Sequence, residues 1–172
     1  MQTIRLILVL AALGAIAIVA VTRPGAAPPD AIDLQIVRYP DLGSRIKELR
    51  GRVVVVDFWA DYCLPCKREF PKLVALHQKY SGDGLTAISV SLDDAADAEV
   101  QVRVRQFLSA QRATFANYML NEKPEVWQAK LKIDGPPCVF VFNRRGELAR
   151  KLHDDVDYRD IERLVADLLK QE

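Results

Sequence analysis

Two cysteines three residues apart carry the most reactive arrangement in this sequence. Cys63 and Cys66 follow a run of β-branched and aromatic residues, 53–59, and begin a stretch with helical spacing. A sulfur at the first turn of a helix lies beside free backbone N–H groups and the positive end of the helix dipole, which favour thiolate over thiol. Because the thiolate is the attacking species in disulfide exchange, Cys63 is the expected nucleophile and Cys66 the resolving thiol.

Other uses of this cysteine pair are less consistent with its context. A zinc site would need a second pair of ligands, and neither His77 nor His153 is suitably spaced. Two buried structural cysteines are the other alternative, but a position at the start of a helix, directly after a strand, favours redox chemistry. With Cys138 the chain holds three cysteines, so at least one thiol is unpaired or intermittently paired.

Alternating strand and helix patterns must position the motif. The apolar spacing predicts strands at 53–59, 85–92, 115–120, 138–142 and 147–152, and helices at 64–80, 97–111, 125–131 and 157–170. The 53–59 run has no polar alternation and suits a central strand that is buried on both faces. This order predicts an α/β fold with a central mixed β-sheet flanked by helices on both faces.

The N-terminus is predicted to be a membrane anchor or signal peptide (1–23), followed by a linker rich in Pro and Ala (24–33) and one domain (34–172). The uncharged residues 6–22 would form a helix of about 26 Å, near the lower limit for a bilayer core. Pro28 follows the candidate cleavage site at 25–27, which favours an uncleaved single-pass anchor; secretion is the alternative. Arg5 before the span predicts a domain on the extracytoplasmic, periplasmic side.

Length and charge limit the number of domains and the kind of partner. The 172 residues suffice for one α/β domain. The 24 basic and 23 acidic residues leave a net charge of +1, which argues against a nucleic-acid partner.

The segments VVVVDFWADYCLPCK and CKREFPKL resemble the thioredoxin superfamily, and in particular its TlpA- and ResA-like membrane-anchored thiol-disulfide oxidoreductases. The resemblance covers roughly residues 49–172. It implies a thioredoxin-like fold, oxidised protein substrates, a membrane electron donor and no cofactor.

Four further residues near the motif acquire expected roles from this resemblance. Asp57 matches the buried acid that would take the proton of Cys66, and Glu69 matches an acid that could tune the same thiol. The alternative for Glu69 is a solvated helix acid. Trp59 and Tyr62 would shape the substrate-binding surface, with packing under the turn as the alternative for Trp59.

The segment Gly135-Pro136-Pro137-Cys138 matches the cis-proline loop of the family, with Pro137 as the expected cis residue. Both prolines would contact the substrate. Pro136 departs from the family pattern because it has no N–H to donate to an incoming peptide. Cys138 is expected to be a small buried strand residue, with a third redox thiol or metal ligand as the alternative.

Three functions follow. The first is reduction of disulfides in exported proteins through Cys63 and Cys66, in cytochrome c or cuproprotein maturation by resemblance. The second is a copper metallochaperone, since soft thiolates select Cu(I). The third is an exported scaffold with an inactive cysteine pair.

Overall fold

The structure, a computed structural model, describes residues 32–171. Its strands are β1 (Leu34–Val37), β2 (Val53–Trp59), β3 (Leu85–Ser91), β4 (Ala116–Leu120), β5 (Cys138–Phe142) and β6 (Leu148–His153). Its α-helices are α1 (Tyr39–Glu48), α2 (Leu64–Tyr80), α3 (Ala98–Ala110), α4 (Pro124–Leu131) and α5 (Tyr158–Leu169), and a short 3₁₀ turn (Ser81–Asp83) follows α2.

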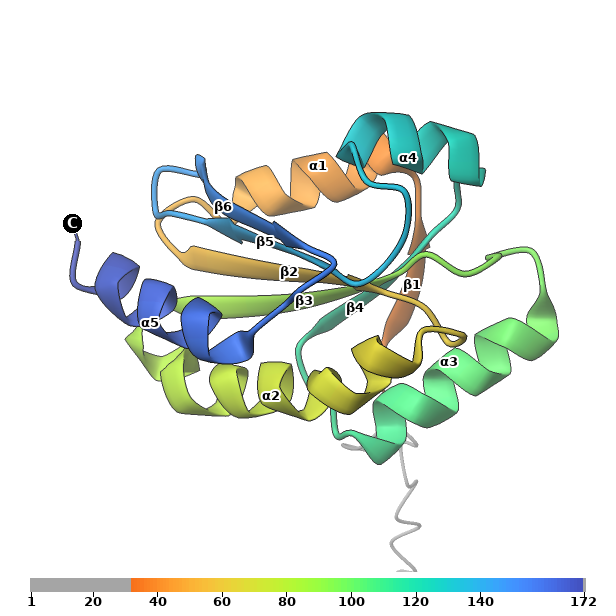
Figure 1. Cartoon of the computed structure of the whole chain (residues 1–172), viewed down its shortest axis with the longest axis horizontal. Helices are drawn as coiled ribbons and strands as arrows, with labels where there is room; N and C mark the ends of the chain where they lie inside the picture. Colours follow the sequence, from red (N-terminus) through yellow and green to blue (C-terminus); the bar gives the residue numbers. More distant parts are fainter. Residues whose placement is uncertain (1–31, 172) are drawn as a thin grey trace, which may run out of the picture.

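The six strands form one mixed sheet in the order β1-β4-β3-β2-β5-β6 (Figure 1). The pairs β1–β4, β4–β3 and β3–β2 are parallel, whereas β5 runs antiparallel to β2 and β6 antiparallel to β5. Helices α1 and α4 cover one face of the sheet, and α2, α3 and α5 cover the other. The prediction of a mixed sheet with helices on both faces is confirmed.

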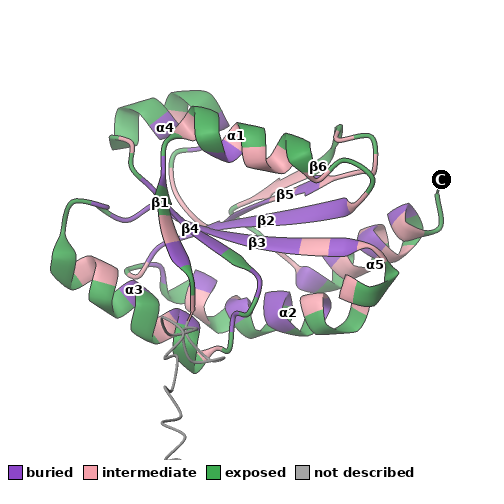
Figure 2. Cartoon of the chain, turned by 180° about the vertical axis from the view of Figure 1, so that it is seen from behind, coloured by how far each residue is buried: buried purple, intermediate pink, exposed green. Residues whose placement is uncertain are grey.

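The central strand β2 is buried along its whole length, as its apolar run predicts (Figure 2). Its side chains alternate between the two layers. Val55 and Trp59 pack on the α2 side, while Val56 and Phe58 pack on the α1 side. Because every residue of β2 is buried, the strand is held firmly in the sheet, and the cysteine turn that follows it has a fixed position.

Two elements, β1 and α1, were not predicted. β1 is an edge strand of four residues that pairs only with β4, so it has little apolar pattern of its own. α1 buries only Leu42 fully, and its N-cap is Arg38, which forms an ion pair with Glu122, rather than one of the short polar residues that usually mark a helix start in a sequence. Both elements form because the finished sheet supplies their partners.

The predicted anchor (1–23) and almost all of the predicted linker (24–33) lie outside the described residues. Within residues 32–171, no helix combines the length and the apolar character that crossing a membrane requires.

Candidate active site

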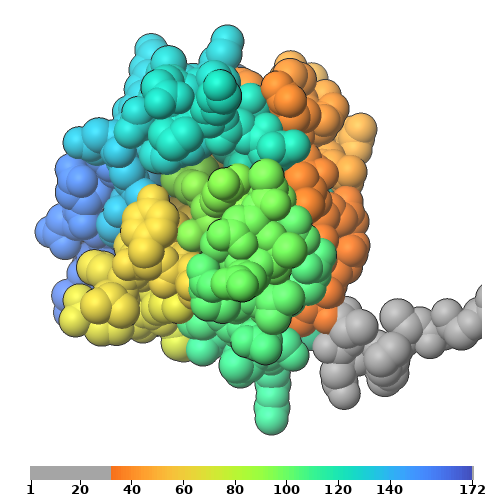
Figure 3. Space-filling model, turned by 90° about the vertical axis from the view of Figure 1, so that its right-hand side faces the viewer, coloured from red at the N-terminus to blue at the C-terminus, as the bar shows by residue number. Residues whose placement is uncertain are grey.

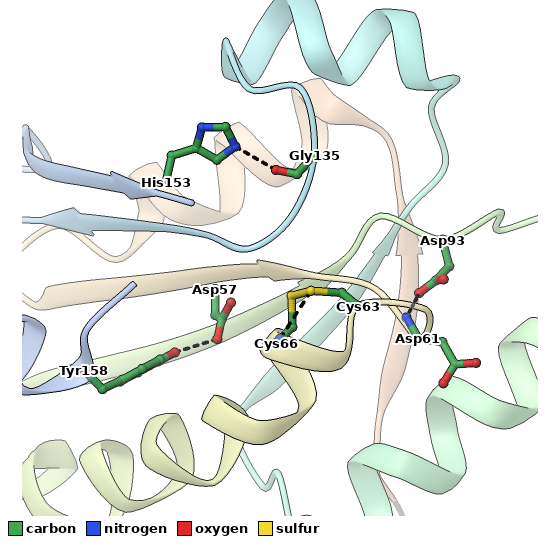
Figure 4. The surroundings of a disulfide bond; sticks show 8 residues. All are labelled: Asp57, Asp61, Cys63, Cys66, Asp93, Gly135, His153 and Tyr158. Atoms are coloured by element: carbon green, nitrogen blue, oxygen red, sulfur yellow. Dashed lines mark hydrogen bonds between the residues drawn. A yellow bond between two sulfur atoms is a disulfide. The ribbon is translucent and has the colours of Figure 1, made fainter. Parts of the chain in front are cut away.

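Cys63 and Cys66 form a disulfide at the N-terminus of α2, directly after the central strand (Figure 4). Their sulfurs are 2.02 Å apart and their Cα atoms 5.3 Å apart. Cys63 is the N-cap of α2, and its Sγ accepts a hydrogen bond from the Cys66 N–H at 3.2 Å. No acidic residue occupies the first turn. When the disulfide is reduced, this N–H and the helix dipole stabilise negative charge on the Cys63 sulfur.

The disulfide lies beneath an apolar rim. Cys63 is 6% exposed and Cys66 3%, whereas Tyr62 and Leu64 are 68% and 71% exposed. Figure 3 shows this turn, in yellow, at the surface beside the green segment around α3 and the teal segment around α4. Tyr62 and Leu64 are therefore the exposed side chains on either side of Cys63 in the sequence, and the substrate-binding role of Tyr62 stays a prediction.

Trp59 does not contribute to this surface. It has no exposed area, and its ring lies 5.3 Å from that of Phe70 and 4.8 Å from that of Phe107, measured between centroids. The prediction that Trp59 shapes the substrate-binding surface is corrected: it packs under the turn, because the end of β2 still belongs to the core.

Asp57 is a buried carboxyl on the same side of the sheet as the disulfide. It lines a cavity of about 260 Å³ together with Cys66, Glu69 and Pro137. Burial raises its pKa from 3.8 to about 7, against the opposing effect of a hydrogen bond donated by Tyr158. A carboxyl that titrates near neutral pH beside Cys66 can accept and return the proton of that thiol.

Glu69 lines the same cavity, one helical turn beyond Cys66. Its side chain is 34% exposed and forms an ion pair with Lys72. This carboxylate is therefore in contact with solvent and with an ammonium group, whereas that of Asp57 is buried. Of the two predicted acids, Asp57 has the surroundings that suit proton exchange with Cys66.

The peptide bond between Pro136 and Pro137 is cis, as predicted. Pro137 lines the cavity beside Cys66 and Asp57. Both prolines are partly exposed, so the carbonyl of Pro136 is the group of this residue that can pair with a passing peptide backbone.

Cys138 lies on the other face of the sheet from the disulfide. In the β2–β5 register it pairs with Phe58, whereas Val139 pairs with Asp57. Because side chains alternate between faces, Cys138 packs in the α1–α4 layer and Asp57 faces α2. Burial raises the pKa of the Cys138 thiol from 9.0 to about 12. Its position favours packing over the alternative of a third redox thiol.

Cys138→Ala is therefore expected to leave the reduction potential and the exchange rate of the protein unchanged, at a stability cost of about 1 kcal/mol for the lost packing. Equilibration with glutathione and thiol trapping measures the potential. In the oxidised wild type, Cys138 should resist alkylation until the chain is denatured. A shifted potential, or a trapped disulfide that contains Cys138, would contradict this assignment.

Asp93 is a positioning residue that the sequence analysis missed. It does not cap the following helix, because Asp97 is the N-cap of α3. The buried Asp93 carboxylate instead accepts hydrogen bonds from the Asp61 N–H at 2.8 Å and the Ser91 hydroxyl at 2.7 Å (Figure 4). It thereby ties the cysteine turn to the end of β3. A polar residue directly after a buried parallel strand was the available signal, since such strand ends meet at one edge.

His153 fixes the loop that precedes the cis bond. Its Nε2 lies 2.9 Å from the Gly135 carbonyl oxygen (Figure 4). The same Nε2 lies 3.2 Å from a carboxylate oxygen of Asp134, and Nδ1 lies 3.5 Å from a carboxylate oxygen of Asp154. These three side chains form the one group within residues 32–171 whose spacing could suit a metal ion. No cysteine belongs to it, so it is separate from the redox pair.

Residues 51–148 match the family model described as thioredoxin-like. The match extends from the residues before β2 to the start of β6 and covers more than half of the chain. This chain therefore belongs to the thioredoxin-like family.

The relatives narrow the class to thiol-disulfide oxidoreductases of the ResA and DsbE type. The thiol-disulfide oxidoreductase ResA of Oceanobacillus iheyensis is 27% identical over 151 residues, which cover 87% of this chain and 75% of that protein. Protein DipZ of Mycobacterium bovis is 30% identical over 135 residues, 72% of this chain but 18% of DipZ. A crystal structure of a thiol:disulfide interchange protein DsbE, so named provisionally, from Chlorobium tepidum superposes with a TM-score of 0.59 at 26% identity, covering 71% and 83% of the two chains.

Proposed function

We propose that this protein reduces disulfides of exported proteins through the Cys63 and Cys66 dithiol. The observation that carries the proposal is the cavity that Cys66 shares with Asp57, a buried carboxyl whose pKa is raised to about 7. A disulfide with a purely structural role never opens, so it exchanges no protons with a neighbouring acid. A dithiol gains and loses protons in each catalytic cycle, and an acid that titrates near neutral pH can supply and accept them.

The proposed reaction has two exchange steps. The Cys63 thiolate attacks one sulfur of the substrate disulfide; the bond to Cys63 forms and the other substrate sulfur leaves as a thiolate, which takes a proton from water. Asp57 then removes the proton of Cys66, and the Cys66 thiolate attacks Cys63. The mixed disulfide breaks, the second substrate sulfur leaves as a thiolate and takes the proton from Asp57, and the protein is left with the Cys63–Cys66 disulfide, oxidised by two electrons. A membrane electron donor would restore the dithiol.

The substrate-binding surface in this proposal is made of Tyr62 and Leu64, which are exposed beside Cys63, and of Pro136 and Pro137 at the cis bond. Because Pro136 cannot donate a backbone hydrogen bond, recognition depends more on side-chain contacts and on the Pro136 carbonyl than on full strand pairing.

We place the domain of residues 34–172 on the extracytoplasmic side of the membrane, tethered through the linker 24–33 by an uncleaved anchor at 1–23. The support is the uncharged run at 6–22 and the position of Arg5 before it. The substrates proposed from the family resemblance are oxidised cysteine pairs in cytochrome c or copper-protein maturation.

The test is the reduction potential of the full-length protein, measured by thiol trapping in glutathione or dithiothreitol buffers. For a reductant we expect a potential close to that of thioredoxin, which is about −270 mV. A value near about −120 mV would identify a strong oxidant and overturn the direction proposed here. Failure to exchange with either buffer would instead identify an inactive cysteine pair.

The copper-chaperone hypothesis has a separate test. Its candidate third thiol, Cys138, faces the opposite layer from Cys63 and Cys66. Uptake of one Cu(I) per reduced chain that survives a competing chelator and is lost in Cys63→Ser would support copper binding. Uptake that the chelator abolishes would leave the reductase proposal in place.

A further inference from the structure

Asp57 is held by a single side chain that the sequence analysis did not single out. The hydroxyl of Tyr158 donates a hydrogen bond to Asp57 Oδ2 at 2.5 Å, across 101 residues of sequence. Within residues 32–171 this is the one side-chain hydrogen bond that Asp57 makes. Figure 4 shows the tyrosine ring reaching from the start of α5 toward the carboxyl, with the disulfide beyond it.

The tyrosine is itself rigidly placed. Tyr158 is 4% exposed and is the first residue of α5, immediately after the N-cap Asp157, whose carboxylate accepts a hydrogen bond from the Arg159 N–H at 2.9 Å. Ile161 and Val165, on the same buried face of α5, anchor the helix in the core. The Tyr158 hydroxyl therefore cannot swing away from Asp57 without disturbing α5.

We propose that Tyr158 is a positioning residue for the exchange reaction: it holds Oδ2 of Asp57, leaves the other carboxylate oxygen free for the Cys66 proton, and sets the pH range of the second step. This inference rests on the role proposed above for Asp57. The hydroxyl remains a donor throughout, because burial and the nearby Asp57 raise the pKa of Tyr158 well above 10.

The sign of the effect follows from the chemistry of the bond. A hydroxyl that donates to a carboxylate stabilises its charged form more than its neutral form, so Tyr158 opposes the effect of burial on Asp57. The other ionisable groups that line the cavity with Asp57 come from two further elements: Cys66, Arg68 and Glu69 of α2, and Asp154 and Asp155 of the loop after β6. Of the contacts that Asp57 makes, the hydrogen bond from Tyr158 is the one that stabilises its charged form.

The test compares Tyr158→Phe with Tyr118→Phe in the full-length protein. Tyr118 is 7% exposed but packs in the opposite layer, so its variant controls for the loss of a buried tyrosine hydroxyl. Two quantities are measured: the pKa of Asp57, from the ¹³C shift of its carboxyl group, and the rate of mixed-disulfide resolution against pH. Tyr158→Phe should raise the pKa by about one pH unit, move the acid limb of the rate profile upward by the same amount and slow resolution at pH 7 up to about tenfold.

The outcomes separate this inference from the function on which it rests. An unchanged Asp57 pKa in Tyr158→Phe, or an equal shift in Tyr118→Phe, would overturn the positioning role. A raised pKa with an unmoved rate profile would overturn it too, and would show that Asp57 does not serve Cys66. Recovery of the wild-type rate above the new pKa, in Tyr158→Phe alone, would establish it.

Discussion

Replacing Cys63 by serine is expected to lower the rate of disulfide exchange by more than about 1000-fold, because the variant loses the nucleophile. Serine keeps a small polar side chain at the N-cap of α2, so the helix should form as before. The measurement is the reduction of a disulfide-bonded model peptide by the prereduced full-length protein.

Cys66→Ser is the matched variant, since it removes the other half of the same pair. It should still attack the substrate but accumulate the mixed disulfide on Cys63, which nonreducing gels and mass spectrometry detect. Accumulation on Cys66 in Cys63→Ser would reverse the roles assigned from helix position.

The second large effect is expected for Asp57→Asn. The amide cannot accept a proton, so Cys66 must lose its proton to water, and resolution should slow about 100-fold at pH 7. Glu69→Gln is the control: its carboxylate is partly exposed and paired with Lys72, and its loss should cost less than about threefold. Release of the substrate thiol from a preformed mixed disulfide measures both. Equal losses in the two variants would contradict the choice of Asp57.

The same variant should change the pH dependence of stability. Asp57 has a pKa of about 7 in the folded protein against 3.8 when exposed, so the folded state binds the extra proton between these values. Stability therefore falls as pH rises through this window, by about 4 kcal/mol in total. The stability of Asp57→Asn should not show this decrease with pH, because asparagine does not titrate.

Urea unfolding of the oxidised proteins at pH 4 and pH 8 checks this expectation. The asparagine variant should be more stable than the wild type at pH 8 and close to it at pH 4. A gain of the same size at both pH values would point to altered packing instead of the titration of Asp57.

The strands and helices that flank the motif could be predicted because each has a strong local signal. The apolar run at 53–59 became β2, and the stripe through Ile161 and Val165 became α5. β1 and α1 could not be predicted, because a four-residue edge strand and a helix with one fully buried residue depend on neighbours that are distant in sequence.

The individual roles around the site divide in the same way. The cis bond at Pro137 was predictable from a local family motif, and it is present. The burial of single residues at the strand ends was harder to predict: the sequence allowed two interpretations of Trp59, a surface aromatic or packing under the turn, and Asp93 was not singled out. Trp59 is buried because its ring packs against Phe107 of α3. Asp93 is buried because it accepts a hydrogen bond from the Asp61 N–H in the cysteine turn.

Spacing along one strand and one helix is enough to specify the cysteine pair, its place at a helix start after a central strand, and the acid six residues before Cys63. The packed fold was needed to show that Cys138 faces away from this pair, that Asp57 rather than Glu69 is desolvated, and that Tyr158 donates a hydrogen bond to Asp57. The physical reason is that desolvation and long-range hydrogen bonds arise from elements that meet in space, here β2 and α5, and no local pattern encodes their meeting.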